Sequence, residues 1–208
     1  DAANHYFPEA KLRPEDVLST WAGVRPLISE HDQTRDGEES SVSREHEIRV
    51  DRDGLITIAG GKLTTYRRMA AEVVDKALGL LMIMGNSPAG LRPARTDTSP
   101  LPGARGWPSN DDPGPVIAKT LEVGEGRVAE DTATYLVGVY GTRALELARM
   151  AALDTEMAQR LIPGRPEILA QVRFAIQHEY AERLSDVMIR RTQLFFRDEN
   201  QGIGAMNT

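Results

Sequence analysis

A cluster of prolines constrains this chain more than any other feature, because it separates two segments that cannot share one continuous pattern of secondary structure. Seven of the 12 prolines lie between residues 85 and 115, namely Pro88, Pro93, Pro100, Pro102, Pro108, Pro113 and Pro115. Proline lacks a backbone N–H and disrupts helix interiors and central strands. We therefore interpret residues 85–115 as a linker between residues 1–84 and residues 116–208.

Residues 1–84 combine short strand-like runs with helical ones. Pro14-Glu15-Asp16 is typical of a helix start, which predicts a helix ending near Trp21, and a short strand is expected at 23–28. Residues 29–42 are polar and charged, and we interpret them as a loop. Residues 43–50 alternate between polar and apolar side chains, 51–54 are turn-forming, and 55–59 are rich in β-branched residues. This pattern predicts a hairpin.

A helix is predicted after this hairpin, because apolar residues recur at the 3.6-residue period of one helix face. These residues are Tyr66, Met69, Ala70, Val73, Val74, Ala77, Leu78 and Leu81. From residue 116 onward we expect an all-helical bundle, with helices near 128–140, 142–151, 154–161, 166–182 and 184–196. Its apolar stripes are Ile168, Leu169, Val172, Ala175 and Ile176, and then Leu184, Val187, Met188, Leu194 and Phe195. The predicted fold class is α+β: a hairpin and one long helix, followed by a helical bundle domain.

Composition excludes several classes of function. The 208 residues include 25 basic and 31 acidic ones, whereas nucleic-acid-binding domains normally carry a basic surplus. No cysteine is available for a disulfide, a thiolate nucleophile or a zinc site, which fits a reducing cytoplasm. The histidines, His5, His31, His46 and His178, lack metal-ligand spacing, and we interpret each as a surface or internally satisfied side chain. The longest apolar run, Ala77 to Met84, is too short to span a membrane.

The segment Gly60-Gly61-Lys62-Leu63-Thr64-Thr65 carries the strongest chemical signal, because it joins the predicted strand to the predicted helix. Glycines allow close approach to the backbone, and the first helical turn presents free N–H donors to negative charge. Lys62 adds a positive charge, and Thr64 or Thr65 could cap the helix. The alternative is a purely structural glycine turn with a solvated lysine.

This segment, extended to Tyr66-Arg67, resembles a signature of FAD-dependent glycerol-3-phosphate dehydrogenases. Trp21-Ala22-Gly23-Val24-Arg25-Pro26-Leu27 resembles the active-site strand that precedes the signature in that family. Tyr6-Phe7 and Pro14-Glu15-Asp16-Val17 fit the approach to this strand. His178-Glu179-Tyr180-Ala181 and Ile189-Arg190-Arg191-Thr192 are similar to the family's C-terminal helical domain.

The resemblance implies a parent flavoprotein that oxidises sn-glycerol 3-phosphate to dihydroxyacetone phosphate with FAD and passes the electrons to quinone. It places Arg25 beside the substrate and the flavin, and Lys62 near the reacting hydroxyl or the flavin. Gly60, Gly61, Lys62, Leu63, Thr64 and Thr65 would line the pyrimidine end of the flavin ring. Two alternatives from the residues alone stay open: Arg25 could form an ion pair with Glu45 or Glu47, and Arg190 and Arg191 could form an ion-paired surface instead of an anion-binding or interface patch.

The start at Asp1, without Met or a signal sequence, suggests a piece of a longer polypeptide. The family's dinucleotide fingerprint would then lie far upstream, so we expect the isolated chain to be inactive and unlikely to bind FAD. Gly124 to Ala129 matches G-x-G-x-x-A, but Glu125 would face the pyrophosphate, and we interpret the match as a loop that opens a helix. Other hypotheses are a non-catalytic helical interaction module and an oxidase that uses O₂. A homodimer and peripheral contact with the inner face of the cytoplasmic membrane also stay open.

Overall fold

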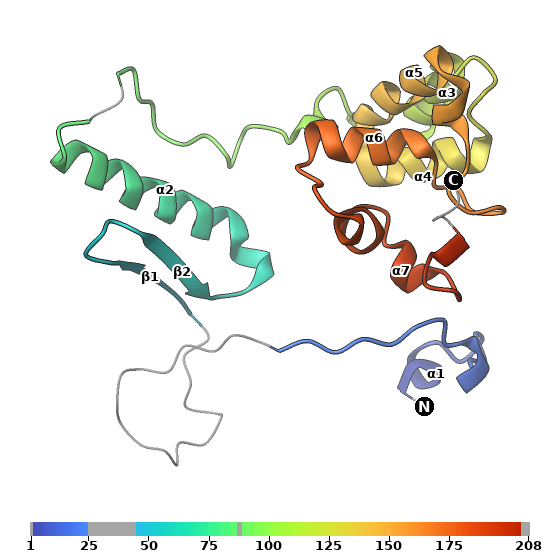
Figure 1. Ribbon diagram of the computed structural model, residues 1–208, viewed down its shortest axis with the longest axis horizontal. Coiled ribbons are helices and arrows are strands. Elements are labelled where there is room, and N and C mark those ends of the chain that lie inside the picture. Colours follow the sequence, from blue (N-terminus) through green and yellow to red (C-terminus); the bar gives the residue numbers. More distant parts are fainter. Residues whose placement is uncertain (1, 25–44, 87–88, 205–208) are drawn as a thin grey trace. The chain divides into compact units, whose positions relative to one another are not determined.

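The computed structural model describes residues 2–24, 45–86 and 89–204. The chain forms two compact units, one of residues 22–99 and one of residues 1–21 together with 100–208. We call them the hairpin unit and the helical unit, and each is described by itself. Their described residues form one antiparallel sheet and several helices, which confirms the α+β class (Figure 1).

The hairpin unit contains the predicted hairpin and long helix. Strands β1 (His46–Val50) and β2 (Ile56–Gly60) pair antiparallel, with Ile48 opposite Ile58 and His46 opposite Gly60. The turn between them includes Gly54 with φ +82°, a conformation that favours glycine. A 3₁₀ turn, Leu63–Thr65, then leads into helix α2 (Tyr66–Ile83), so both predictions are confirmed.

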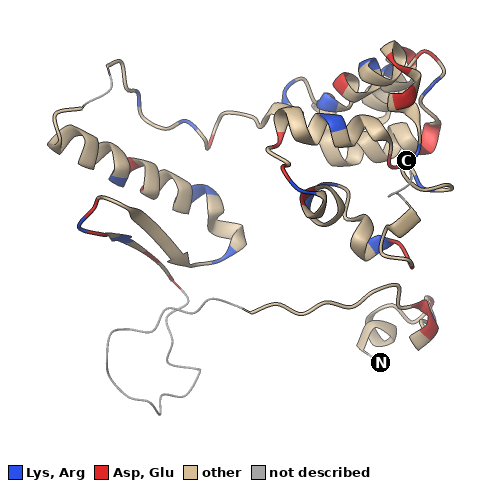
Figure 2. Cartoon of the chain, viewed as in Figure 1, with Lys and Arg blue, Asp and Glu red and all other residues tan. Residues whose placement is uncertain are grey.

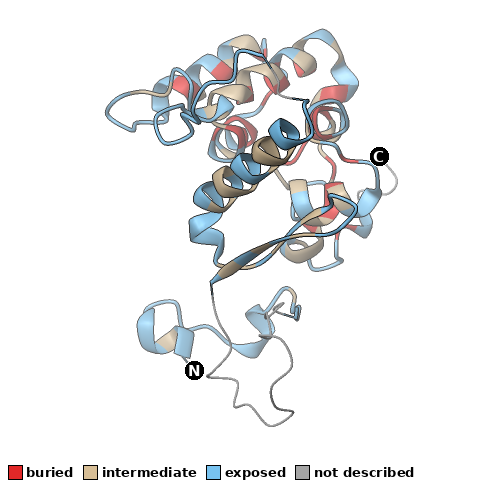
Figure 3. Ribbon diagram, turned by 90° about the vertical axis from the view of Figure 1, so that its left-hand side faces the viewer, coloured by how far each residue is buried: buried red, intermediate tan, exposed pale blue. Residues whose placement is uncertain are grey.

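The apolar face of α2 is only partly covered in this unit. Tyr66, Val74 and Leu81 belong to the predicted apolar face, yet they are 57%, 52% and 37% exposed. No residue of α2 is buried, and the strands alternate only between half-buried and exposed (Figure 3). One hairpin and one helix offer too little surface to enclose a core. The periodicity therefore predicted the helix correctly, although this face lacks full cover among the described residues.

The helical unit contains the core. Helices α3 (Gly114–Val123), α4 (Glu130–Tyr140), α5 (Ala144–Leu153) and α6 (Leu169–His178) pack around fully buried residues that include Leu136, Leu147 and Phe174. The short helices α1 (Ala2–Tyr6) and α7 (Leu194–Arg197) belong to the same unit. Acidic and basic residues are interspersed among uncharged ones along the chain (Figure 2).

Several predicted helices are shorter than expected. The segment after Pro14 forms a single 3₁₀ turn, Pro14–Asp16, because Val17 adopts an extended backbone. Residues 154–161 form only the 3₁₀ turn Thr155–Ala158, after which Arg160 makes a bridge with Ile168. The expected strand at 23–28 lies largely outside the described residues.

The predicted helix at 184–196 is interrupted. A π-helical turn, Asp186–Arg191, is separated from α7 by Gln193, whose φ of +58° breaks the helical path. Within this segment Arg190 pairs with Asp186 at 2.8 Å and Arg191 with Glu179 at 3.3 Å. The ion-paired alternative for these two arginines is therefore confirmed.

The predicted stripe is buried or half-buried except for Ile176, and the helix also buries Phe174 and Gln171. Ile176 is 59% exposed, whereas Phe174 and Gln171 are completely buried. Gln171 is tolerated there because its Oε1 accepts the backbone N–H of Ile168 at 3.0 Å. The prediction that Ile176 belongs to the core was wrong. The apolar residues of α6 cover a wide arc of the helix, and periodicity does not determine which edge of that arc is buried.

Candidate functional site

The glycine-rich segment forms a tight connection between β2 and α2. Gly60 and Gly61 have φ values of +74° and +75°, which reverse the chain at the end of the strand. The first hydrogen bond of the following turn runs from the N–H of Thr65 to the carbonyl of Lys62, so the N–H groups of Leu63 and Thr64 precede it. The predicted strand, glycine pair and helix are thus confirmed, with one 3₁₀ turn between glycines and helix.

The threonine cap takes another form than expected. Thr65 occupies the N-cap position of α2, but its side chain accepts no capping hydrogen bond. Its hydroxyl instead donates to the carbonyl of Lys62 at 2.9 Å. The hydroxyl therefore braces the turn that carries Lys62, and the prediction of a side-chain cap was wrong.

Because Gly61 has no side chain, residues of α2 and β1 can pack directly against it. A Cβ at this position would lie 2.8 Å from Sδ of Met69 and 3.1 Å from Cβ of His46. The glycine thus allows α2 and β1 to pack closely on the turn. This packing supports the structural interpretation of Gly61, while Lys62 remains exposed for a ligand.

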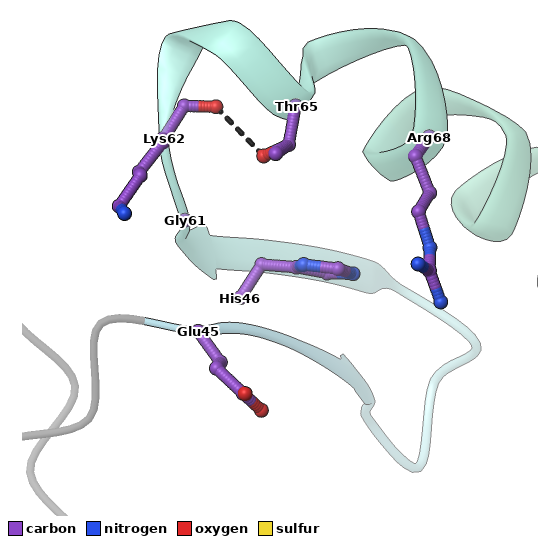
Figure 4. A pocket seen from close by; sticks show the side chains of 6 residues that line it. All are labelled: Glu45, His46, Gly61, Lys62, Thr65 and Arg68. Carbon is purple, nitrogen blue, oxygen red and sulfur yellow. Dashed lines mark hydrogen bonds between the residues drawn. The ribbon is translucent and has the colours of Figure 1, made fainter.

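An open pocket of about 370 Å³ lies at this junction, and we call it the Lys62 pocket. Its lining residues are Glu45, His46, Gly61, Lys62, Thr65 and Arg68. Figure 4 shows the Lys62 side chain extending toward one end, while the His46 ring lies along the hairpin and reaches toward Arg68. The pocket therefore has a basic group at each end.

A chain of hydrogen bonds runs from α2 to the pocket. Arg68 Nε donates to Oε1 of Glu72 at 2.8 Å, and Nε2 of His46 lies 2.6 Å from Oε2 of the same carboxylate. The hydrogen bond from Arg68, followed by that from His46, lowers the pKa of Glu72 below its ordinary value. Glu72 is therefore a carboxylate at neutral pH and accepts a hydrogen from Nε2 of His46.

The structure brings together part of the predicted site. Lys62 and Gly61 line the Lys62 pocket, with Thr65, whereas Leu63 and Thr64 are exposed on the turn beside it. Arg25 lies outside the described residues. Of its proposed partners, Glu47 pairs with Arg49 at 2.7 Å.

His46 and Arg68 were not predicted as site residues. The expectation that His46 is an internally satisfied histidine is correct, because Glu72 binds it. Its place in the pocket could have been found from the predicted hairpin, since pairing across the turn at 51–54 sets His46 opposite Gly60. His178 packs its ring against Phe174 at 4.8 Å, in agreement with the packing role implied for it.

Two other sites are not supported. The glycine motif at 124–129 follows helix α3 instead of a strand, so the rejection of a dinucleotide fingerprint there is confirmed. Among the described residues no group of three histidine or carboxylate side chains is arranged to hold a metal ion.

Known proteins resemble this chain along nearly its whole length. Residues 94–208 match the family described as the C-terminal domain of alpha-glycerophosphate oxidase. The aerobic glycerol-3-phosphate dehydrogenase of Bacillus subtilis (strain 168) is 38% identical over 198 residues, which cover 95% of this chain and 34% of that protein. The mitochondrial glycerol-3-phosphate dehydrogenase of Rattus norvegicus is 36% identical, over 94% of this chain and 25% of that protein.

A solved structure shares the fold. The glycerol-3-phosphate dehydrogenase of Bacillus halodurans, crystallised with FAD, superposes with a TM-score of 0.60 at 29% identity. The match covers 94% of this chain and 35% of that one. This chain therefore spans about a third of the length of its bacterial relatives.

Fold and site together define an α+β protein in which a glycine–lysine turn joins a hairpin to a long helix, ahead of a helical unit. The chain belongs to the family of FAD-dependent glycerol-3-phosphate dehydrogenases and alpha-glycerophosphate oxidases, and it corresponds to their C-terminal portion. The resemblance inferred from the sequence motifs is confirmed.

Proposed function

We propose that this chain is the C-terminal part of a flavoprotein that oxidises sn-glycerol 3-phosphate to dihydroxyacetone phosphate and passes the electrons to quinone. In this proposal residues 1–84 end the FAD- and substrate-binding domain, 85–115 form a linker, and 116–208 form a C-terminal helical bundle domain. Arg25 binds the substrate phosphate or the reacting oxygen, since its guanidinium stays protonated.

The observation that carries this proposal is the position of Lys62 on the turn before α2, within a chain whose relatives are named glycerol-3-phosphate dehydrogenases. FAD, when bound, accepts the hydride and gains negative charge at its pyrimidine end. The ammonium of Lys62 and the N–H groups of Leu63 and Thr64 are donors suited to that charge. Gly60, Gly61 and Thr65 complete this edge of the binding site.

The described residues form one wall of such a site. The Lys62 pocket of about 370 Å³ is open and lined by six residues, all of them from β1, α2 or the segments beside them. A dinucleotide needs a glycine-rich cradle for its pyrophosphate as well. We therefore expect the isolated chain to be inactive and to leave FAD in solution.

The test uses the complete polypeptide that carries this chain, purified with its flavin. Reduction of the flavin by glycerol 3-phosphate is followed by stopped-flow absorbance in the wild type, in Lys62→Met and in the control Lys76→Met on α2. We expect Lys62→Met to slow reduction about 100-fold, the cost of losing one preorganised charge donor, while Lys76→Met matches the wild type. A wild-type protein whose flavin is not reduced by glycerol 3-phosphate contradicts the proposal.

A second candidate acceptor is O₂, favoured by the family description, which names an alpha-glycerophosphate oxidase. The two acceptors differ in their product, because an oxidase releases one H₂O₂ for each substrate oxidised. Measuring H₂O₂ against reduction of a soluble quinone assigns the acceptor.

A third candidate is a non-catalytic helical module that binds another protein. A defined complex in a pull-down or sizing experiment, formed without flavin, would favour it over the enzyme.

Location and assembly follow from the proposed chemistry. No helix in the described part of the chain is long and apolar enough to cross a bilayer. Because quinone resides in the membrane, we propose a cytoplasmic location with peripheral contact at the inner membrane face. We also propose that the protein forms a homodimer. Vesicle sedimentation and light scattering of the complete protein measure these two properties.

A further inference from the structure

His46 lines the Lys62 pocket without a role in the function proposed above, and the inference about it rests on that function. Its side chain is 20% exposed, and its ring extends from β1 along the floor of the pocket (Figure 4). A histidine held in a pocket by a carboxylate is a common arrangement at binding and catalytic sites, because the carboxylate selects one tautomer.

Glu72 determines which ring nitrogen is available. Its carboxylate lies 2.6 Å from Nε2, so Nε2 carries the hydrogen and Nδ1 of the neutral ring presents a lone pair. Arg68 donates to the other oxygen of Glu72 at 2.8 Å and helps to orient the carboxylate. In this tautomer the ring presents Nδ1 as a hydrogen-bond acceptor in an orientation set by Glu72.

The two ends of the Lys62 pocket suit different groups of a ligand. Lys62 extends at one end as an exposed ammonium, whose three donor hydrogens can meet a phosphate as well as the flavin. At the other end the positive charge of Arg68 is offset by the Glu72 carboxylate, and His46 leaves Nδ1 able to accept from a hydroxyl. A hydroxylated phosphoester of small size matches both ends.

We propose that His46 is a substrate-binding residue, whose Nδ1 accepts a hydrogen bond from a hydroxyl of the phosphoester bound against Lys62. The Arg68–Glu72 pair orients the ring for this contact. His46 then contributes to discrimination between glycerol 3-phosphate and an analogue that lacks the hydroxyl.

The test compares two ligands in the complete flavoprotein after anaerobic reduction, a state in which no oxidation can occur. Dissociation constants of glycerol 3-phosphate and of propane-1,3-diol monophosphate, which lacks the central hydroxyl, are measured by titration calorimetry. In the wild type we expect the hydroxylated ligand to bind about tenfold more tightly, the effect of one hydrogen bond.

Two variants separate ligand binding from a merely structural role. The polar end of Asn coincides with the Nδ1 position of a histidine, and that of Gln with the Nε2 position. His46→Asn is therefore expected to keep most of the discrimination between the two ligands. His46→Gln is expected to keep the contact with Glu72 but to lose the discrimination. Flavin content and thermal denaturation verify that both variants are folded.

Equal binding of the two ligands by the wild type overturns the inference. So does discrimination that survives in His46→Gln, or that disappears in both folded variants. Failure of the proposed function is distinguishable, because the oxidised wild-type flavin would then not be reduced by glycerol 3-phosphate.

Discussion

Arg160 donates hydrogen bonds from both terminal guanidinium nitrogens to the carboxylate of Asp131, over 2.6 and 2.8 Å. The pair joins the first turn of α4 to the segment that precedes α6. The hydrogen bond from Arg160 is the largest cause that lowers the pKa of Asp131 below its ordinary value. Because the Asp131 side chain is 54% exposed, solvent screens most of this interaction.

Asp131→Asn tests how much the Asp131–Arg160 pair contributes to the free energy of unfolding and how that contribution depends on pH. A carboxyl whose pKa is lower in the folded state stabilises the fold above its unfolded pKa of about 4, and this contribution is lost as pH falls through the folded pKa. We expect the wild type to exceed the variant by about 0.5 kcal/mol in unfolding free energy at pH 7. Urea denaturation of the chain should show the difference shrinking below about pH 4, and a difference independent of pH contradicts this account.

Phe174→Ala tests the buried face of α6. The ring is fully buried, meets Tyr140 edge-on with centroids 5.4 Å apart, and lies 4.5 Å below the Arg143 guanidinium. Its removal leaves a cavity and should lower the free energy of unfolding by about 3–5 kcal/mol. The exposed Ile176→Ala, two residues away, should change it by about 0.5 kcal/mol or less. Equal losses in the two variants, measured by chemical denaturation, would show that α6 does not bury the face that carries Phe174.

Gly141→Ala tests a close approach between two backbone segments. Gly141 ends α4 with φ +59°, and a Cβ there would overlap the carbonyl of Gly103. Thr142 Oγ1 donates to that same carbonyl at 3.1 Å, so the segment cannot withdraw without losing this bond. We expect a loss of about 3 kcal/mol in unfolding free energy. The control Gly126→Ala also has positive φ (+77°) but open space around it, and should cost about 1 kcal/mol.

Glu167→Gln tests a buried charge. The carboxylate is completely buried, with Arg165 Nε at 3.4 Å and Arg197 Nη1 at 3.5 Å. Neutralising it leaves two neighbouring arginines without their counter-charge, and although the Arg197 side chain is 43% exposed, Nε of Arg165 is buried. A loss of about 2 kcal/mol in unfolding free energy is expected, below that of fully buried pairs. Glu146→Gln, at a partly exposed carboxylate paired with Arg143, serves as control and should cost about 0.5 kcal/mol.

Gly61→Ala tests the turn that carries Lys62. An added Cβ meets Met69 and His46 and must adopt φ +75°, so the turn has to shift. In the complete flavoprotein we expect weaker FAD retention during dialysis. Met69→Ala in the same protein should not restore retention, because it removes the contact with Met69 but leaves the close contact with Cβ of His46 and the backbone strain. Full recovery in the double variant would show that packing alone requires the glycine.

The sequence by itself determined the hairpin, α2 and the glycine–lysine connection. Each depends on interactions between residues close in the chain: alternation at 46–60, the helical stripe from Tyr66 to Leu81, and glycines with positive φ at 60 and 61. The family motif at 60–67 followed from the same local order. Such features are readable because neighbours in sequence are also neighbours in space.

Only the tertiary structure decided which side of each element meets a partner. Phe174 is buried and Ile176 exposed because α5 and Tyr140 of α4 contact one face of α6, a choice that the stripe leaves open. His46 enters the Lys62 pocket because Glu72, 26 residues later, binds its ring, and Gly61 permits that approach. These contacts join residues far apart in the chain, and their free energy depends on packing that no local pattern encodes.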